Sequence, residues 1–252
     1  MVQRGQFLER SVVVRSGGLS LDGLYHRGRR APPCAIASPH PALGGSMTVP
    51  AVAELAWALT RAGFPTLRFD YRGVGASQGR SRHAAGEGRI EDVSEEAADL
   101  RAAVEQLVQS TRADAACAVG YSFGAAVALR AAQDPTIERL VLIAPPTTLW
   151  DFSGLSDLRK PLLVVCAHHD PLCDRSRLQL PQGAQLAVIA HADHAFLRGL
   201  PELGRTVAAW VESGPTRREL PDAPGAGEPG QEGFREVDLP ESGEPPLELD
   251  ES

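Results

Sequence analysis

The chain has 252 residues, 43% of them hydrophobic and 23% charged, and a formal net charge of -7 at pH 7. This length and composition are typical of one soluble globular domain with a substantial core. Residues 214–252 carry eleven acidic and three basic side chains, so the rest of the chain is close to neutral. No basic patch is present that would indicate a nucleic-acid partner.

Neither a targeting segment nor a membrane span is expected. No apolar run follows the N-terminal residues, and no uninterrupted apolar stretch approaches the ~18 residues of a spanning helix. The cysteines Cys34, Cys117 and Cys166 fall in predicted buried strands and show no C-x-x-C spacing, which favours reduced thiols and a cytoplasmic protein. Cys173 lies close to the predicted site, and we expect it to have a packing role.

Apolar runs and helical periodicity alternate along the chain. The expected strands cover residues 7–15, 19–26, 34–38, 66–70, 115–119, 139–144, 161–167 and 185–190. The expected helices cover residues 48–62, with Thr48 as a candidate cap, 90–108, 125–133 and 194–212. The first two strands should form an antiparallel hairpin at one edge. The unbroken apolar runs of the last three suit a parallel sheet that is covered on both faces.

This alternation predicts an α/β fold with a mostly parallel, doubly wound sheet and an antiparallel N-terminal edge. We expect one domain over residues 1–213. Residues 214–252, rich in Pro, Gly and Glu, should form a disordered acidic tail that could recruit a protein partner.

The central feature is the junction between the predicted strand 115–119 and the helix that follows. It reads Gly120-Tyr-Ser122-Phe-Gly124, which matches the G-x-S-x-G nucleophile elbow. There a serine projects from a strained tip, and glycines allow strand and helix to pass close together. A second match, Gly75-Ala-Ser77-Gln-Gly79, lies in a polar loop with no strand before it and no apolar helix after it, and we interpret it as a loop.

A serine hydroxyl needs a general base, and the base needs an orienting acid. On this fold both follow the serine, in the order acid then histidine, at the ends of later strands. We assign Asp170 as the acid and His194 as the base, with Asp174 and His191 as the alternatives.

Two histidine pairs could suggest a metal, namely His168 with His169 and His191 with His194. No H-E-x-x-H pattern is present, and a pair spaced i, i+3 in a turn is poor evidence for zinc. We therefore expect neither a metal nor another cofactor.

The chain resembles the α/β-hydrolase superfamily, and within it the small lidless bacterial esterase-like hydrolases of the dienelactone-hydrolase type. The stretches that carry this resemblance are His40–Gly45, Arg68–Ser77, Gly120–Gly124, Asp170–Leu172 and Ala192–Phe196.

The resemblance implies that the Arg72–Ser77 loop is structural. We separately expect Asp70 and Arg72 to pair below the site. The resemblance also implies that the backbone N–H of Phe123 forms one half of an oxyanion hole and that of Ala42 the other, since Pro41 has no N–H.

Only 48 positions separate Ser122 from Asp170, which leaves no room for a separate lid domain. The site should be open, with Trp150 and Phe152 at its border. The candidate substrate contacts are His40, Leu43, Tyr121 and Trp150.

These residues predict a serine hydrolase that cleaves a small-molecule acyl substrate through an acyl-enzyme. A carboxylic ester is the first expectation, followed by a thioester or an amide. An acyltransferase with the same triad and a non-catalytic binding protein on the same fold remain as alternatives.

Overall fold

The computed structural model describes residues 8–83, 85, 92–214 and 220. Its strands are β1 (Arg10–Ser16), β2 (Leu19–His26), β3 (Cys34–Ala37), β4 (Thr66–Phe69), β5 (Ala116–Tyr121), β6 (Ile137–Ile143), β7 (Leu162–His169) and β8 (Gln185–Asp193). Its α-helices are α1 (Pro50–Arg61), α2 (Ser94–Thr111), α3 (Phe123–Ala131) and α4 (Leu200–Ser213). Short 3-10 turns are η1 (Pro41–Leu43), η2 (Ser153–Asp157) and η3 (Arg175–Arg177).

The described strands form one sheet in the order β1-β2-β4-β3-β5-β6-β7-β8. The predicted hairpin is confirmed: β1 pairs antiparallel with β2, which pairs antiparallel with β4. From β4 to β8 all neighbours are parallel. The carboxyl ends of β3, β5, β7 and β8 therefore meet at one edge of the sheet.

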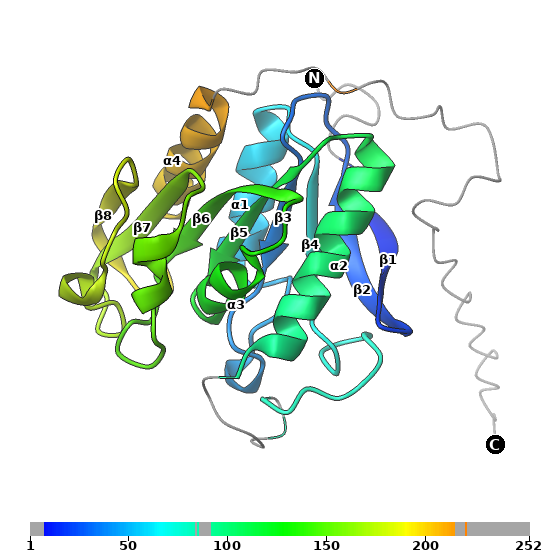
Figure 1. The fold of residues 1–252 in the computed structure, drawn as a ribbon, viewed down its shortest axis with the longest axis horizontal. Coiled ribbons are helices and arrows are strands. Elements are labelled where there is room, and N and C mark those ends of the chain that lie inside the picture. Colours follow the sequence, from blue (N-terminus) through cyan, green and yellow to red (C-terminus); the bar gives the residue numbers. More distant parts are fainter. Residues whose placement is uncertain (1–7, 84, 86–91, 215–219, 221–252) are drawn as a thin grey trace, which may run out of the picture.

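Helices cover both faces of the sheet, as the alternation of elements predicted (Figure 1). Helices α2 and α3 pack on one face, where Leu100 and Val127 belong to a buried apolar cluster. On the opposite face, α1 and α4 bury Leu55 and Val207 in a second cluster. The sheet is thus doubly wound, and its central strands are buried on both sides.

The structure corrects three expectations about elements. Helix α1 has Val49 as its N-cap, with no side-chain capping bond, so Thr48 does not cap it. Helix α4 begins at Leu200 and not near His194, because Phe196 (φ 53°) and Gly199 (φ 98°) have left-handed backbone that an α-helix cannot include.

Strand β8 is the third correction, since it is not covered on both faces. It ends the sheet, and its apolar side chains Leu186 and Val188 are exposed. Strands β7 and β8 are also longer than expected, so that His168, His169 and His191 belong to strands and not to loops.

The predicted acidic tail lies almost entirely outside the described residues. Of residues 215–252 only Leu220 is described; it is buried, and its N–H donates to the carbonyl of Arg29 at 2.6 Å. No helix in the described part of the chain is both long and apolar enough to cross a membrane.

Candidate active site

The site is organised by the sharp turn from β5 into α3. Ser122 occupies that turn with φ 56° and ψ -119°, a backbone conformation that is strained for a side chain with a Cβ. A Cβ on Gly120 would lie 2.0 Å from the carbonyl oxygen of Gly124, and one on Gly124 would lie 2.4 Å from that of Ala37. Both positions therefore require glycine, for the close approach that the pattern predicted.

Three side chains that are far apart in sequence meet at this turn. The hydroxyl of Ser122 lies 2.9 Å from Nε2 of His194, and Nδ1 of His194 lies 2.8 Å from Oδ2 of Asp170. Asp170 directly follows β7 and His194 directly follows β8, and the register pairs His169 with Asp193. The parallel strands thus place the acid and the base beside the serine.

The carboxylate of Asp170 is fully buried, whereas the imidazole of His194 is 23% exposed. The second carboxylate oxygen of Asp170, Oδ1, accepts hydrogen bonds from the backbone N–H groups of Leu172 (2.9 Å) and Cys173 (3.3 Å). These bonds fix the orientation of the carboxylate and leave Oδ2 for the histidine.

Neither alternative residue takes part. Asp174 is exposed and caps η3, where its Oδ1 accepts hydrogen bonds from the N–H and the hydroxyl of Ser176. The bond from the Ser176 hydroxyl is the main cause that lowers the pKa of Asp174. His191 is exposed on β8, and among the described residues no hydrogen bond links it to Ser122 or Asp170.

Tyr121, a candidate substrate contact, has a supporting position. Its side chain is buried, and its hydroxyl donates to the carbonyl oxygen of His194 at 2.9 Å. Burial, and secondarily the negative charge of Asp170, raises the pKa of Tyr121 to about 12, so the hydroxyl keeps its proton. The residue before the serine therefore anchors the backbone of His194.

The loop after β3 changes the candidate oxyanion hole. The N–H of Ala42 donates to Nδ1 of His40 at 3.2 Å, so it is already used within its own loop. Within the described residues, the backbone N–H groups of His40 and Phe123 have no acceptor. The free N–H of His40 is therefore the better second donor, while that of Phe123, at the start of α3, stays the first.

Three other rings surround the side chain of Phe123, the residue after Ser122. Its centroid lies 4.9 Å from that of His40, 5.1 Å from His83 and 5.6 Å from Trp150. Burial, together with the neighbouring His83, lowers the pKa of His40, which keeps that imidazole neutral and able to accept at Nδ1. His83 is not singled out from the sequence, because it follows the polar Gly75–Gly79 loop, which we interpret as structural.

The other border residues are less informative. Trp150 and Phe152 are buried, so Trp150 supports Phe123 by packing, and Phe152 belongs to the same apolar cluster. Leu43 lies on η1 with 81% of its surface exposed, and neither apolar cluster includes it.

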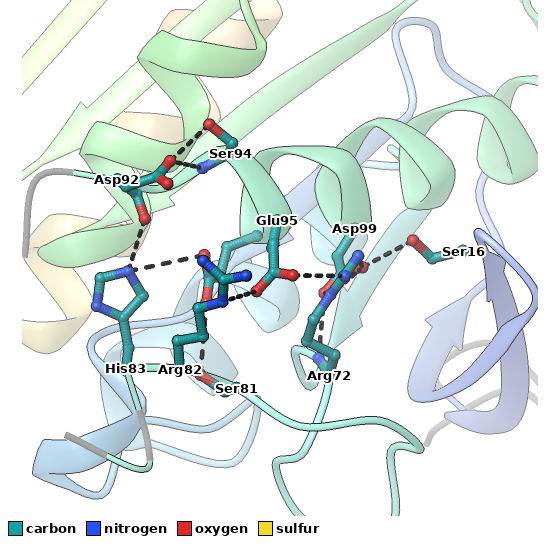
Figure 2. A network of polar contacts seen from close by, with 10 residues as sticks. Ser16, Arg72, Ser81, Arg82, His83, Asp92, Ser94, Glu95 and Asp99 are labelled. Atoms are coloured by element: carbon teal, nitrogen blue, oxygen red, sulfur yellow. Dashed lines mark hydrogen bonds and ion pairs between the residues drawn. The ribbon is translucent and has the colours of Figure 1, made fainter. Parts of the chain in front are cut away.

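The second G-x-S-x-G loop is held by polar contacts and not by a helix. Ser77 accepts from the N–H of Asp22 (2.9 Å) and donates to the carbonyl of Asp70 (2.8 Å). The expected Asp70–Arg72 pair does not form. Arg72 instead contacts the buried carboxylate of Asp99 on α2, with the shortest contact at 2.6 Å (Figure 2).

Comparisons with known proteins agree with this fold. Residues 43–155 match the family described as "Serine aminopeptidase, S33". An uncharacterised protein of Rickettsia prowazekii is 27% identical over 204 residues, which are 74% of this chain and 82% of that protein.

Solved structures are similar over most of the described fold. An α/β serine hydrolase homologue from Coxiella burnetii is 27% identical with a TM-score of 0.69, covering 79% of this chain and 95% of its own. A Xanthomonas campestris protein, described as an α/β serine hydrolase without lid, is 28% identical with a TM-score of 0.67, covering 82% and 97%. A dienelactone hydrolase from Anabaena variabilis, 22% identical with a TM-score of 0.70 and covering 84% and 100%, shares the fold.

The region between β6 and β7 holds only the short turn η2, so the described chain has no lid domain. The chain belongs to the α/β-hydrolase superfamily and is similar to its lidless serine-hydrolase members.

Proposed function

We propose that this protein is a serine hydrolase that cleaves acyl bonds of small molecules, with carboxylic esters as its preferred substrates. One observation carries the proposal: an unbroken chain of hydrogen bonds runs from Ser122 through His194 to the buried carboxylate of Asp170. A serine that served only the turn would need neither the base nor the acid.

In the proposed mechanism, Nε2 of His194 removes the proton of the Ser122 hydroxyl as its oxygen attacks the acyl carbonyl. Asp170 holds Nδ1–H and stabilises the imidazolium that forms. The N–H groups of Phe123 and His40 receive the developing oxyanion, and loss of one such donor typically lowers the rate by about 10²–10³-fold. His194 then protonates the leaving group and later activates the water that releases the acyl group.

The surroundings of the serine favour a neutral substrate. The groups beside Phe123 are aromatic rings and an imidazole that is held neutral. Asp170, the carboxylate in contact with the site, is occupied by His194 and two backbone N–H groups. It cannot also bind the ammonium group of a peptide N-terminus, which is why we place esters before peptides.

Peptide amides form the second candidate substrate class, because the family match is to serine aminopeptidases. A panel of p-nitrophenyl esters of different acyl length and aminoacyl p-nitroanilides separates the two, with Ser122→Ala as the control. We expect ester turnover by the native chain and labelling of Ser122 by a fluorophosphonate probe.

Two further measurements test roles and competing reactions. Asp170→Asn should lower kcat by about 10⁴-fold, as expected when the imidazole loses its orienting acid, whereas the exposed Asp174→Asn should stay close to the native rate. Transfer of the acyl group to an added alcohol in preference to water would instead identify an acyltransferase. No turnover and no probe labelling in a folded native chain would contradict any hydrolase.

A further inference from the structure

Two cysteines lie against each other directly behind the acid of the site. Cys166 belongs to β7 and is fully buried, and Cys173, in the loop that follows Asp170, is 7% exposed. Their sulfur atoms are 3.1 Å apart, and both thiols are free in the structure. A disulfide bond needs about 2.05 Å between the sulfurs, so an approach of roughly 1 Å would close it.

The electrostatics of the pair favour reaction. The hydrogen bond from Cys173 lowers the pKa of Cys166 despite its burial, while the same bond and burial raise the pKa of Cys173. One sulfur is thus the better thiolate and the other holds the proton. This is the arrangement of an attacking and a resolving thiol.

The remaining two cysteines provide an internal comparison. Cys34 and Cys117 are direct partners across β3 and β5 and are fully buried. Their thiols contact backbone carbonyls, at 3.6 Å from Pro32 and 3.9 Å from Ala118. Burial, followed by the hydrogen bond with Cys117, raises the pKa of Cys34 well above its usual value, which disfavours the thiolate that attacks a peroxide. We expect this pair to stay reduced under conditions that oxidise the first.

We propose that Cys166 and Cys173 form a peroxide-sensitive dithiol that closes to a disulfide and thereby lowers the activity of the adjacent site. Hydrogen peroxide suits the site because it is small enough to reach sulfurs that are almost fully covered. The Cys166 thiolate attacks one peroxide oxygen, the O–O bond breaks, and a sulfenic acid and hydroxide form. The hydroxide takes the proton of Cys173, whose sulfur displaces the sulfenic oxygen as a second hydroxide that is protonated to water. In total, two thiols and one peroxide become one disulfide and two waters.

The link to the site runs through the backbone of Cys173. Its N–H donates to Oδ1 of Asp170 at 3.3 Å, already the longer of the two backbone bonds that hold this carboxylate. Drawing Cys173 toward β7 lengthens that bond and weakens the orientation of His194. Full loss of one hydrogen bond to a charged group would correspond to a factor of about 10–150. A lengthened bond keeps part of that contribution, so we expect kcat to fall by up to about tenfold. This second half of the proposal rests on the proposed function, whereas the thiol chemistry does not.

The experiment uses the full native chain, treated with hydrogen peroxide, quenched with catalase and titrated for free thiols in denaturant. We expect the count to fall from four to two, and the tryptic peptide 160–175, which contains both cysteines, to become 2 Da lighter. Dithiothreitol should restore both values together with esterase activity. The double variant Cys34→Ala/Cys117→Ala should fall from two free thiols to none.

Two single variants, Cys166→Ser and Cys173→Ser, control for other effects of peroxide, because in each the activity should no longer respond to the treatment. Four free thiols after treatment, a disulfide that involves Cys34 or Cys117, or oxidation of Cys166 only to a sulfinic acid would each overturn the proposed disulfide. A complete disulfide with unchanged kcat would overturn its effect on the site. A native chain that forms the disulfide but hydrolyses no substrate would contradict the proposed function and leave the thiol chemistry supported.

Discussion

The chain contains the pattern Gly-x-Ser-x-Gly twice, and the two copies have different structural roles. Ser122 and Ser77 are equally covered, each with 8% of its surface exposed. The hydroxyl of Ser122 meets an imidazole at 2.9 Å, whereas that of Ser77 bridges two backbone groups, the N–H of Asp22 and the carbonyl of Asp70. The comparison shows that the secondary structure around the serine, and not the five-residue pattern itself, determines whether its hydroxyl meets a base.

The glycines differ in the same way. Gly120 and Gly124 are required because backbone atoms approach within 2.0 and 2.4 Å of where a Cβ would stand. Gly75 and Gly79 are required for their positive φ angles of 56° and 88°, which turn the loop. One pair allows a strand and a helix to pack closely, and the other allows a turn.

The largest expected effect is on the reactive serine. Ser122→Ala should lower kcat/KM for p-nitrophenyl esters by more than about 10⁴-fold, because among the described residues no other hydroxyl is hydrogen-bonded to the imidazole of His194. The thermal unfolding midpoint should change little. Ser77→Ala is the matched control and should keep activity within a few-fold of the native chain. An active Ser122→Ala variant would remove the distinction between the two copies.

The second effect compares glycines. Gly124→Ala should lower the free energy of unfolding by at least about 3 kcal/mol, because its Cβ meets the carbonyl of Ala37 and the β3–α3 packing must open. Gly79→Ala should lower it by about 1–2 kcal/mol, the penalty for left-handed backbone, since its nearest contact is the flexible tip of Leu19. Urea denaturation measures both. Equal losses would show that the two glycines serve the same purpose.

Ser77→Ala is expected to act on stability and not on turnover. It leaves the N–H of Asp22 and the carbonyl of Asp70 without their shared partner, which should lower the free energy of unfolding by about 1–3 kcal/mol. Ser156→Ala, which removes an exposed bond to Ser153, should stay within about 0.5 kcal/mol of the native chain and serves as the control. An unchanged stability of Ser77→Ala would contradict the bridging role.

The smallest effect should depend on pH. The loop that carries Ser77 continues to Ser81 and His83, which face α2 (Figure 2). Their partner on α2 is the buried Glu96, whose carboxylate accepts from the hydroxyl of Ser81 at 3.4 Å and lies 3.8 Å from Nε2 of His83. Burial, the largest cause, raises the pKa of Glu96, with Asp99 and Glu95 acting in the same direction. The folded chain then binds more protons than the unfolded chain between the ordinary and the raised pKa, so this group's contribution to stability falls as pH rises through that range.

Glu96→Gln removes that dependence. The free energy of unfolding of the variant, relative to that of the native chain, should therefore increase from about pH 4.5 towards neutrality. Urea denaturation at a series of pH values measures it. A relative stability that falls over this range would show that the carboxylate is stabilised, and not penalised, by its surroundings.

Much of the fold could be predicted from the sequence because its signals are local. Each local signal spans fewer than about ten adjacent residues. Examples are the buried strand before Gly120, the helix formers after Gly124 and the turn between them. The order Ser122, Asp170, His194 could also be predicted, because each residue comes shortly after an apolar run with the length and flanking residues of a strand. Parallel strands then bring their carboxyl ends to one edge whatever the loops between them do.

Only the tertiary structure decided the contacts between distant segments. The exposure of β8 depends on its place at the end of the sheet. The sequence could not predict that place, because an apolar run has the same pattern in a central strand and in an edge strand. The free N–H of His40, the anchoring hydroxyl of Tyr121 and the adjacency of Cys166 and Cys173 rest on distances of a few ångströms. Sequence periodicity and propensity indicate which face of a helix or strand a residue occupies. Hydrogen bonds and sulfur contacts between distant segments depend instead on how those helices, strands and loops pack against one another.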